Sequence, residues 1–393
     1  MNSSPIPYGR QDISEEDIEH VLSALKSDYL TQGPMVPEFE VCVAAYCGAQ
    51  FSVAVNSATS ALHIACLALG VRRGDIVWTS PITFVATANA PVYCGAQIDF
   101  VDVNPDTYNL DVELLRLKLE AAKKTGNLPK VLIPVHFAGQ SCDMRTIKLL
   151  SEEFNFKIIE DASHAIGASY LEEKVGSCKY SDITVFSFHP VKIITTAEGG
   201  MALTNNFLLA NRMKLLRSHG ITREVSQMEG GSDGPWYYQQ VGLGFNYRMT
   251  ELQAALGISQ MKRLDEFVSE RRRLAQQYDE ALSHFPIKLP YQSPSSKSSY
   301  HLYPIWIDED GIGLDRKNIF EQLQKNNIGV NVHYIPVHLQ PFYKKKGFRR
   351  GQFPESEKYY RGAISIPLFA GLGKNISFVI EALHQSLKLI QPR

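Results

Sequence analysis

The sequence predicts an α/β protein with a mostly parallel central sheet in a large domain and a smaller α/β domain after it. Short runs rich in β-branched and aromatic residues alternate with longer amphipathic stretches in the first part of the chain, as in βαβ units. This rhythm ends near residue 250, where a long helical pattern begins. The chain has 393 residues, more than a single hydrophobic core usually organises, which favours two or three packed units.

The β-rich runs are the expected strands of the large domain: Ser52 to Val55, Asp75 to Thr79, Gln97 to Val101, Val131 to Val135, Phe156 to Ile159, Ile183 to Phe188 and Met201 to Thr204. Helices are expected to begin between them, near Thr59, Phe84, Asp111, Arg145 and Asn206. An amphipathic helix, with Ile18, Val21, Leu22 and Leu25 on one face, precedes the first strand. In such a sheet, ligands gather beyond the carboxyl ends of the strands.

A change in composition marks the second domain. One long helical pattern runs from about Thr250 to His284, and a Pro- and Ser-rich stretch over 286–299 follows. An isolated strand, His301 to Trp306, and further helix come next. We therefore predict a large domain over 10–250 and a small C-terminal domain over 251–393, joined in space by the N-terminal residues.

Composition and charge exclude several classes of protein. The 40 basic and 41 acidic residues give a formal net charge of -1, without the basic surface that nucleic-acid binding needs. The chain contains no apolar run long enough to cross a bilayer. Six cysteines lie far apart without a Cys-x-x-Cys pair, which indicates reduced thiols in the cytoplasm rather than disulfides or zinc. His333 and His338 have no third ligand at fitting spacing, so no metal site is expected.

Two residues with reactive side chains follow predicted strands in the middle of the chain. Asp161 comes at the end of the apolar strand that contains Ile158-Ile159, where a carboxylate could keep the ring nitrogen of a cofactor such as pyridoxal phosphate protonated. The alternative is a cap on the next turn. Lys192 follows the strand that ends at Phe188, where partly dry surroundings could free its amine to react with an aldehyde. The alternative is an ordinary surface lysine.

A candidate phosphate site lies where the first predicted strand turns into a helix, at Asn56-Ser57-Ala58-Thr59-Ser60. Backbone N–H groups at the positive end of a helix dipole bind phosphate readily. A plain Ser or Thr N-cap would explain the same residues. Ser187 offers another hydroxyl on the opposite side of the expected cleft.

Taken together, these segments resemble the DegT/DnrJ/EryC1/StrS sugar aminotransferases, pyridoxal-phosphate enzymes of fold type I. The resemblance covers nearly the whole chain. Its most specific stretches are Phe186-Ser187-Phe188 with Lys192, Glu198-Gly199-Gly200, and the run from Gly244 to Gly257. Ala58 and His164, where many relatives have Gly and Gln, resemble the branch of the family that serves pseudaminic acid biosynthesis.

The resemblance implies a role for each matching residue. It assigns Lys192 to the covalent attachment of pyridoxal phosphate and to proton transfer, and Asp161 to the pyridine nitrogen. His164 would lie at the hydroxyl side of the ring, and Phe84 would stack on it. Packing of Phe84 in the core is the alternative, and His164 and His189 could instead be partly buried histidines with their own hydrogen bonds.

The remaining roles concern the phosphate, the partner subunit and the substrates. The resemblance implies that Ala58, Thr59 and Ser187 hold the phosphate. Asn246 would reach the same phosphate from the second subunit, so a homodimer with shared active sites is expected. Substrate contacts are expected from Tyr8, Asp28, Tyr29, Leu30, Thr31, His301 and Tyr303.

The implied reaction moves the amino group of L-glutamate to C4 of a UDP-linked 4-keto-6-deoxy-N-acetylhexosamine. One alternative is a sister enzyme that acts on a perosamine-type or 4-amino-arabinose-type keto-sugar. A dehydratase of the same fold is expected to lack the lysine at position 192. A non-catalytic sensor of cofactor or sugar nucleotide would need no electron sink, so Asp161 and Lys192 together count against it.

Overall fold

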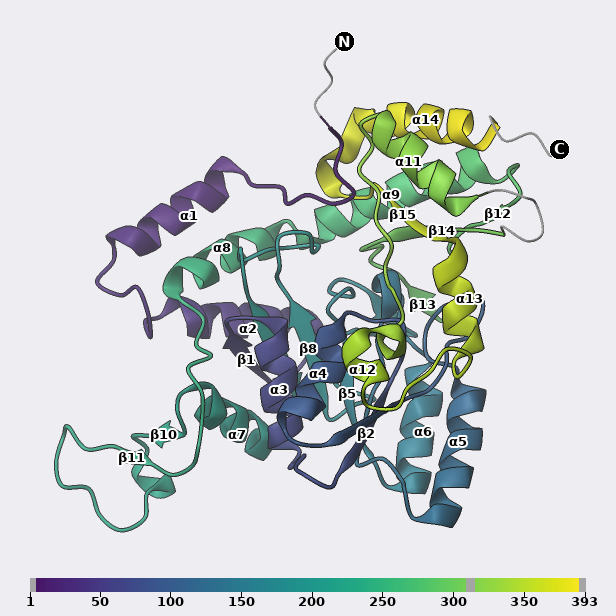
Figure 1. Cartoon of the computed structure of the whole chain (residues 1–393). Helices are drawn as coiled ribbons and strands as arrows, with labels where there is room; N and C mark the ends of the chain where they lie inside the picture. The colour runs from purple at the N-terminus through teal and green to yellow at the C-terminus, as the bar shows by residue number, and fades with distance from the viewer. Residues whose placement is uncertain (1–4, 309–314, 389–393) are drawn as a thin grey trace.

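A seven-stranded sheet forms the centre of the larger part of the protein (Figure 1), in a computed structural model that describes residues 5–308 and 315–388. The strand order is β1-β9-β8-β5-β4-β2-β3. The strands are β1 (Phe51–Val55), β2 (Ile76–Thr79), β3 (Gln97–Phe100), β4 (Val131–Ile133), β5 (Lys157–Asp161), β8 (Ile183–Ser187) and β9 (Gly200–Thr204). Each of the seven predicted strands is present, with ends that differ by a few residues.

One strand runs against the others. β9 pairs antiparallel with both β8 and β1, whereas the pairs that join β8, β5, β4, β2 and β3 are parallel. A parallel connection needs a crossover, usually a helix, and residues 188–199 between β8 and β9 form none. The prediction of a mostly parallel sheet is confirmed. In the register of β9, Gly200 lies opposite Val55 on one side and Ser187 on the other.

The helices between the strands begin where the sequence predicts them: α3 (Ala58–Ala68), α4 (Val85–Tyr93), α5 (Val112–Thr125), α6 (Met144–Phe154) and α7 (Phe207–Arg217). Polar side chains cap the N-termini of α3, α5, α6 and α7, whereas α4 follows Phe84 and has no side-chain cap. Asp111, for example, accepts hydrogen bonds from the N–H groups of Glu113 and Leu114 at the start of α5. The spacing of Met144, Ile147, Leu150 and Phe154 gives α6 one buried face, and α6 lies beside α5 on the sheet (Figure 1).

The long helix expected over 250–284 is two helices, α8 (Glu251–Lys262) and α9 (Leu264–Leu282), divided at Arg263. α8 packs on α1 (Glu15–Lys26) and α2 (Met35–Cys47). At the division, Arg263 donates a hydrogen bond of 2.6 Å to the buried carboxylate of Asp17 in α1. This ion pair attaches the N-terminal helix to the junction of α8 and α9.

A second hydrophobic core lies around a three-stranded sheet, β12 (Ile287–Lys288), β14 (Tyr303–Ile307) and β15 (Ala363–Ile366). Helices α9, α11 (Arg316–Lys325) and α14 (Ile376–Lys388) cover it. Ile6 packs in this core, and its backbone pairs with Ile328. The core begins at Leu274, while Ala254 and Val268 still pack with the large sheet. The change of core therefore falls between Val268 and Leu274, within α9 and later than the predicted boundary at residues 250 and 251.

Short elements complete the described part of the chain: β6 (Ser169–Tyr170), β7 (Glu173–Lys174), β10 (Ile221–Thr222), β11 (Gln239–Gln240), β13 (Ser296–Lys297), α12 (Pro341–Lys344), α13 (Pro354–Gly362), and the 3-10 turns η1 (Phe137–Gly139), η2 (Val225–Gln227), η3 (Val337–Leu339) and η4 (Ala370–Asn375). The segment between α7 and α8, which contains β10 and β11, extends away from the body of the protein (Figure 1). Its side chains Val225, Trp236, Tyr238 and Leu243 are exposed.

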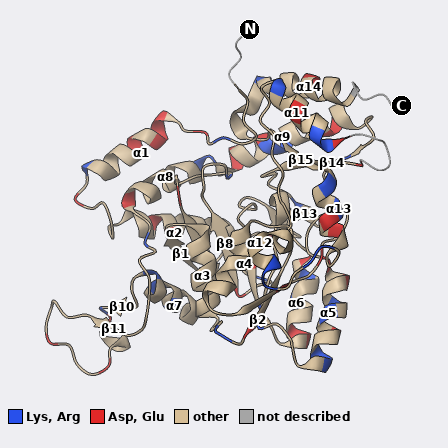
Figure 2. Cartoon of the chain, viewed as in Figure 1, with Lys and Arg blue, Asp and Glu red and all other residues tan. Residues whose placement is uncertain are grey.

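Charged residues of both signs are mixed along outer helices such as α1, α5 and α13, whereas α3, α4 and β8 carry almost none (Figure 2). Within the described ranges, no helix combines the length and the apolar character needed to span a membrane. The outer helices are therefore charged, whereas α3, α4 and β8, which surround the candidate site, are nearly free of charged residues.

Candidate active site

A cavity of about 1020 Å³ lies at the carboxyl ends of β5 and β8. Both structural units line it, because Tyr8, His301 and residues 331–335 face it from the side of the second core. Nine of the residues predicted to bind cofactor or substrate line this cavity: Tyr8, Ala58, Thr59, Phe84, Asp161, His164, Ser187, Lys192 and His301.

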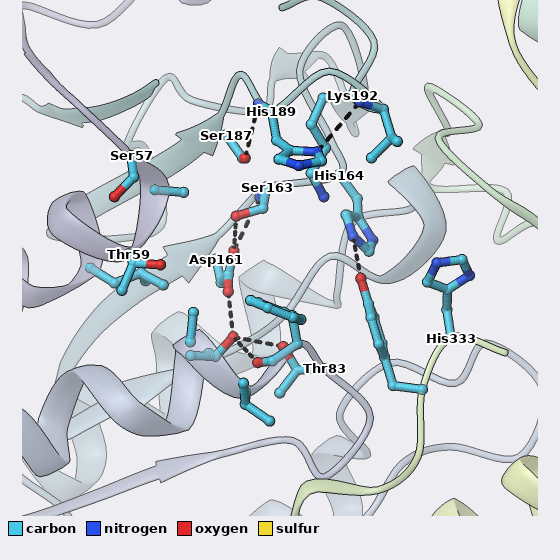
Figure 3. Close-up of a pocket in the computed structure, with 18 of the residues that line it drawn as sticks. Ser57, Thr59, Thr83, Asp161, Ser163, His164, Ser187, His189, Lys192 and His333 are labelled. Carbon is cyan, nitrogen blue, oxygen red and sulfur yellow. Dashed lines mark hydrogen bonds between the residues drawn. The ribbon is translucent and has the colours of Figure 1, made fainter. Parts of the chain in front are cut away.

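The N-terminus of α3 forms one end of the cavity (Figure 3). Ser57 caps the helix by accepting a hydrogen bond of 3.2 Å from the N–H of Ser60. The N–H groups of Ala58 and Thr59 belong to the first turn and have no partner within the helix, so they are available to an anion. Gly200 packs against this turn so closely that a Cβ there would lie 2.5 Å from the nitrogen of Ala58.

Asp161 lies at the end of β5 with its carboxylate held by three donors. The hydroxyl of Thr87 donates to Oδ2 at 2.6 Å, and the hydroxyl and N–H of Ser163 donate to Oδ1 at 2.6 and 3.1 Å. The hydrogen bond from the Ser163 N–H to Asp161 is the turn cap that the sequence offered as the alternative role of Asp161. The carboxylate nevertheless lines the cavity, so Asp161 can form the turn and still face a bound ring.

Phe84 is 59% exposed although it is a large apolar residue. It precedes α4 and lines the cavity, with its ring centroid 6.4 Å from that of Tyr334. The alternative of core packing is therefore wrong for this residue. An aromatic ring exposed to a cavity offers a face on which another ring can stack.

Lys192 lies in the loop between β8 and β9 and is only partly exposed. Desolvation lowers the pKa of its amine from 10.5 to about 8, although the negative charge of Asp161 raises that pKa. An ordinary surface lysine would not show this shift. Near neutral pH the amine therefore has a useful fraction of the free base, the form that reacts with carbonyl carbons.

His164 is buried and has partners for both ring nitrogens. Nδ1 accepts a hydrogen bond of 3.3 Å from the N–H of Ala138, and Nε2 lies 3.0 Å from the hydroxyl of Tyr334. Burial and the charge of Lys192 keep the pKa of His164 well below its usual value. The neutral ring thus carries its proton on Nε2 and donates to Tyr334. His189, by contrast, is exposed at the rim.

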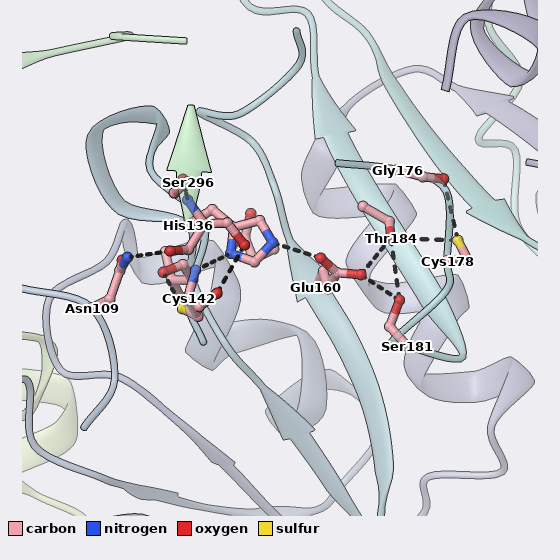
Figure 4. A network of polar contacts seen from close by, with 12 residues as sticks. Asn109, His136, Cys142, Glu160, Gly176, Cys178, Ser181, Thr184 and Ser296 are labelled. Carbon is pink, nitrogen blue, oxygen red and sulfur yellow. Dashed lines mark hydrogen bonds and ion pairs between the residues drawn. The ribbon is translucent and has the colours of Figure 1, made fainter. Parts of the chain in front are cut away.

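A polar network behind β5 fixes the strand that carries Asp161 (Figure 4). Glu160 accepts hydrogen bonds from Ser181, from Thr184 at 3.0 Å and from Nε2 of His136 at 2.6 Å. Nδ1 of His136 in turn accepts from the N–H of Cys142. Because successive residues of a strand face opposite sides, the network holds Glu160 on one side while Asp161 faces the cavity on the other.

Six predicted site residues do not line the cavity. Asp28, Tyr29, Leu30 and Thr31 lie exposed between α1 and α2, and Asn246 is exposed beside Ser218. Tyr303 is fully buried in the second core, and its hydroxyl donates to Asp279. Tyr303, Ile305 and Ile307 share the core side of β14, so the structure corrects the predicted contact of Tyr303 with substrate.

Several residues of the cavity were not singled out from the sequence. Thr87 and Ser163 hold Asp161, while Asn331, His333 and Tyr334 come from a segment far along the chain. The sequence signal in the segment of Asn331 and Tyr334 was the pair His333 and His338. Only His333 lines the cavity, because His338 lies outside it and contacts Glu357 at 3.0 Å. In the described ranges no group of three or more His, Cys, Asp or Glu side chains could hold a metal ion.

Comparison with known proteins agrees with this site. The DegT/DnrJ/EryC1/StrS aminotransferase family model matches residues 11–384. A UDP-4-amino-4,6-dideoxy-N-acetyl-β-L-altrosamine transaminase of Campylobacter jejuni is 39% identical over 98% of both chains. The spore coat polysaccharide biosynthesis protein SpsC of Bacillus subtilis is 38% identical over 98% of this chain and 97% of SpsC. Helicobacter pylori PseC, an aminotransferase involved in the biosynthesis of pseudaminic acid, superposes with a TM-score of 0.89 at 30% identity, over 98% of this chain and 100% of PseC.

These similarities confirm the family that the motifs predict. Aminotransferases of this family use pyridoxal phosphate. The cavity fits that cofactor, because a helix N-terminus with free N–H groups, a carboxylate and a lysine of lowered pKa meet in it. The chain belongs to the DegT/DnrJ/EryC1/StrS aminotransferase family and is a pyridoxal-phosphate-dependent sugar aminotransferase.

Proposed function

We propose that the protein transfers the amino group of L-glutamate to C4 of a UDP-linked 4-keto-6-deoxy-N-acetylhexosamine. The product would be UDP-4-amino-4,6-dideoxy-N-acetyl-β-L-altrosamine, for pseudaminic acid biosynthesis. One observation carries the proposal: Lys192, Asp161 and the N-terminus of α3 meet in one cavity, in a chain 39% identical to a transaminase of that name.

The cofactor would be held at both ends. The N–H groups of Ala58 and Thr59 and the hydroxyl of Ser187 would bind its phosphate. Asp161 would hold the proton on its ring nitrogen, and Phe84 would stack on the ring. When bound, pyridoxal phosphate withdraws electrons from the substrate carbon that loses a proton.

Lys192 would act as the nucleophile and as the proton carrier. Its amine, with a pKa of about 8, can take a proton from a substrate carbon and return it at a neighbouring position without a large energetic penalty. His164 donates its Nε2 proton to Tyr334, which leaves the hydroxyl proton of Tyr334 free to point toward the ring. Donor and acceptor would occupy the same cavity in turn.

The active unit would be a homodimer with shared sites, in which Asn246 binds the phosphate in the neighbouring subunit. The exposed side chain of Asn246 and the exposed apolar residues of the segment between α7 and α8 support this arrangement. Tyr8 and His301 would contact the substrates from the cavity wall. We keep as proposed substrate contacts the exposed residues Asp28, Tyr29, Leu30 and Thr31, which the partner subunit could bring to the site.

A sister enzyme that acts on a different keto-sugar is the second candidate, because the 38% identity to SpsC is almost the same as that to the altrosamine transaminase. The purified holoenzyme should be incubated with glutamate and enzymatically made UDP- and GDP-linked 4-keto-sugars, and the products identified by NMR. Amination of the UDP-linked N-acetylhexosamine alone supports the first candidate, and amination of another sugar in preference refutes it. A cytoplasmic location stays a prediction from the cysteine pattern.

A further inference from the structure

Two histidines in the cavity wall have ring nitrogens without a partner in the described part of the chain. His301 is 4% exposed, and neither of its ring nitrogens has a hydrogen bond; its Nδ1 is fully sealed from solvent. Nδ1 of His333 lies 2.9 Å from the hydroxyl of Ser365, and its Nε2 has no partner. Both residues line the cavity, so each can present Nε2 to whatever the cavity contains.

Both imidazoles are neutral. Burial, reinforced by the charge of Lys192, lowers the pKa of His333 to about 3 and keeps that of His301 well below its usual value. A neutral imidazole donates from one nitrogen and accepts at the other. The Ser365 hydroxyl can rotate to donate to Nδ1 of His333, and Nε2 then carries the proton into the cavity.

The cavity is poor in cations. Among the described residues that line it, Lys192 is the one cation, against the carboxylates of Asp161 and Glu198, and no arginine is present. An α-amino acid donor has a carboxylate bonded to the carbon that bears the reacting amine. Within one subunit, that carboxylate therefore finds no guanidinium in the cavity lining and needs other donors close to Lys192.

A buried cation stands behind this wall. Arg271 is 2% exposed and donates to the backbone oxygens of Tyr300, His301 and Leu368, at 3.2, 3.2 and 2.7 Å. No carboxylate pairs with it in the described ranges. Its positive charge therefore acts on His301 and favours an anion on the cavity side of that ring. The bonds to Tyr300 and His301 also fix the backbone that carries the imidazole.

We propose that His301 and His333 form the subsite for the carboxylate of the amino donor, with Arg271 as a positioning residue behind it. This inference rests on the proposed function, in which the donor is an amino acid. His164 is excluded from the subsite because both of its ring nitrogens are engaged. On the view in Figure 3, His164 and His333 lie on the side of the cavity opposite Ser57 and Thr59, so the subsite and the phosphate end are well separated.

Glutarate, which has the carboxylates of glutamate but no amine, tests the subsite in the holoenzyme. Binding of glutarate and of UDP-N-acetylglucosamine is measured by calorimetry for the wild type, His301→Leu and His301→Gln. The leucine variant should bind glutarate at least about tenfold more weakly, since a hydrogen bond to a charged group is lost. The amide N–H of glutamine stands near the position of Nε2, so His301→Gln should recover most of the affinity. In His301→Leu the loss of affinity should be smaller for the sugar nucleotide than for glutarate. His333→Leu and His333→Gln repeat the comparison.

Single-turnover absorption changes give a second readout. His301→Leu should slow the half-reaction with glutamate more than the half-reaction with the keto-sugar. Unchanged glutarate binding in both leucine variants overturns the proposed subsite. An equal loss of affinity for glutarate and for the sugar nucleotide also overturns it, as does a loss of affinity for the sugar nucleotide alone. If the wild-type enzyme reacts with no amino acid, the proposed function is refuted. If the wild type reacts normally and the leucine variants are unaffected, only the subsite is refuted.

Discussion

The lowered pKa of Lys192 predicts an unusual reactivity that can be measured one lysine at a time. With a pKa of about 8, roughly a tenth of the amine is unprotonated at pH 7. An amine at the ordinary value of 10.5 would have roughly 0.03% in that form. The free base of Lys192 is therefore roughly 300 times more abundant than expected for a solvated lysine. Below pH 8 its reaction with an electrophile should rise about tenfold per pH unit, and above pH 8 it should level off.

Trace labelling of the apoenzyme with acetic anhydride between pH 6 and 11 provides the assay. Mass spectrometry of the digest gives the labelled fraction of each lysine, and the exposed Lys344 serves as the internal reference. Asp161→Asn tests the cause, because the carboxylate of Asp161 raises the pKa of Lys192. Its removal should move the midpoint to lower pH. A midpoint near 10.5 in the wild type, or a shift to higher pH in the variant, would refute the reasoning.

Three further outcomes follow from the site. Gly200→Ala should release the cofactor and its yellow colour, because the new Cβ would meet the nitrogen of Ala58 at 2.5 Å, whereas Gly231→Ala, at an open position, should keep both. Asp161→Asn should lower kcat by orders of magnitude at an unchanged melting temperature. A kcat within a few-fold of wild type would mean that Asp161 only caps the local turn. Asn246→Asp and Lys192→Ala, each nearly inactive, should recover about a quarter of wild-type activity when their subunits exchange, because half of the dimers are hybrids with one intact site. No recovery despite exchange, verified by mass spectrometry, would rule out shared sites.

The large domain could be predicted from the sequence because its signals are local. Each strand of the central sheet is a short apolar run, and α3, α5, α6 and α7 begin at polar caps such as Asp111 or Asn206. The division of the helical pattern at Arg263 has no such signal, and the ion pair that Arg263 forms there joins it to Asp17, far away in the chain. Tertiary contacts of this kind are invisible to hydrophobic periodicity.

The same contrast applies to the site. Asp161 and Lys192 each follow a recognisable strand, so their place in the cavity could be predicted. His333 and Tyr334 reach the cavity from the second core, and Thr87 acts through Asp161. None of these roles leaves a pattern in the neighbouring residues. Tyr303 shows the opposite error, because a motif suggested a contact while the alternation of Tyr303, Ile305 and Ile307 on the core side of β14 places it inward.

The row formed by Val55, Gly200 and Ser187 has a consequence for how the protein folds. β9 is the last strand of the sheet to be synthesised, yet it lies between β1 and β8. The helix N-terminus that follows Val55 and the hydroxyl of Ser187 are therefore brought together only when β9 inserts between strands already made. Contacts between residues so far apart in sequence form slowly. A nascent chain that ends before Gly200 would thus have every residue of the turn that we propose to bind phosphate and still lack the strand beside it, so we expect cofactor capture to be a late event in maturation.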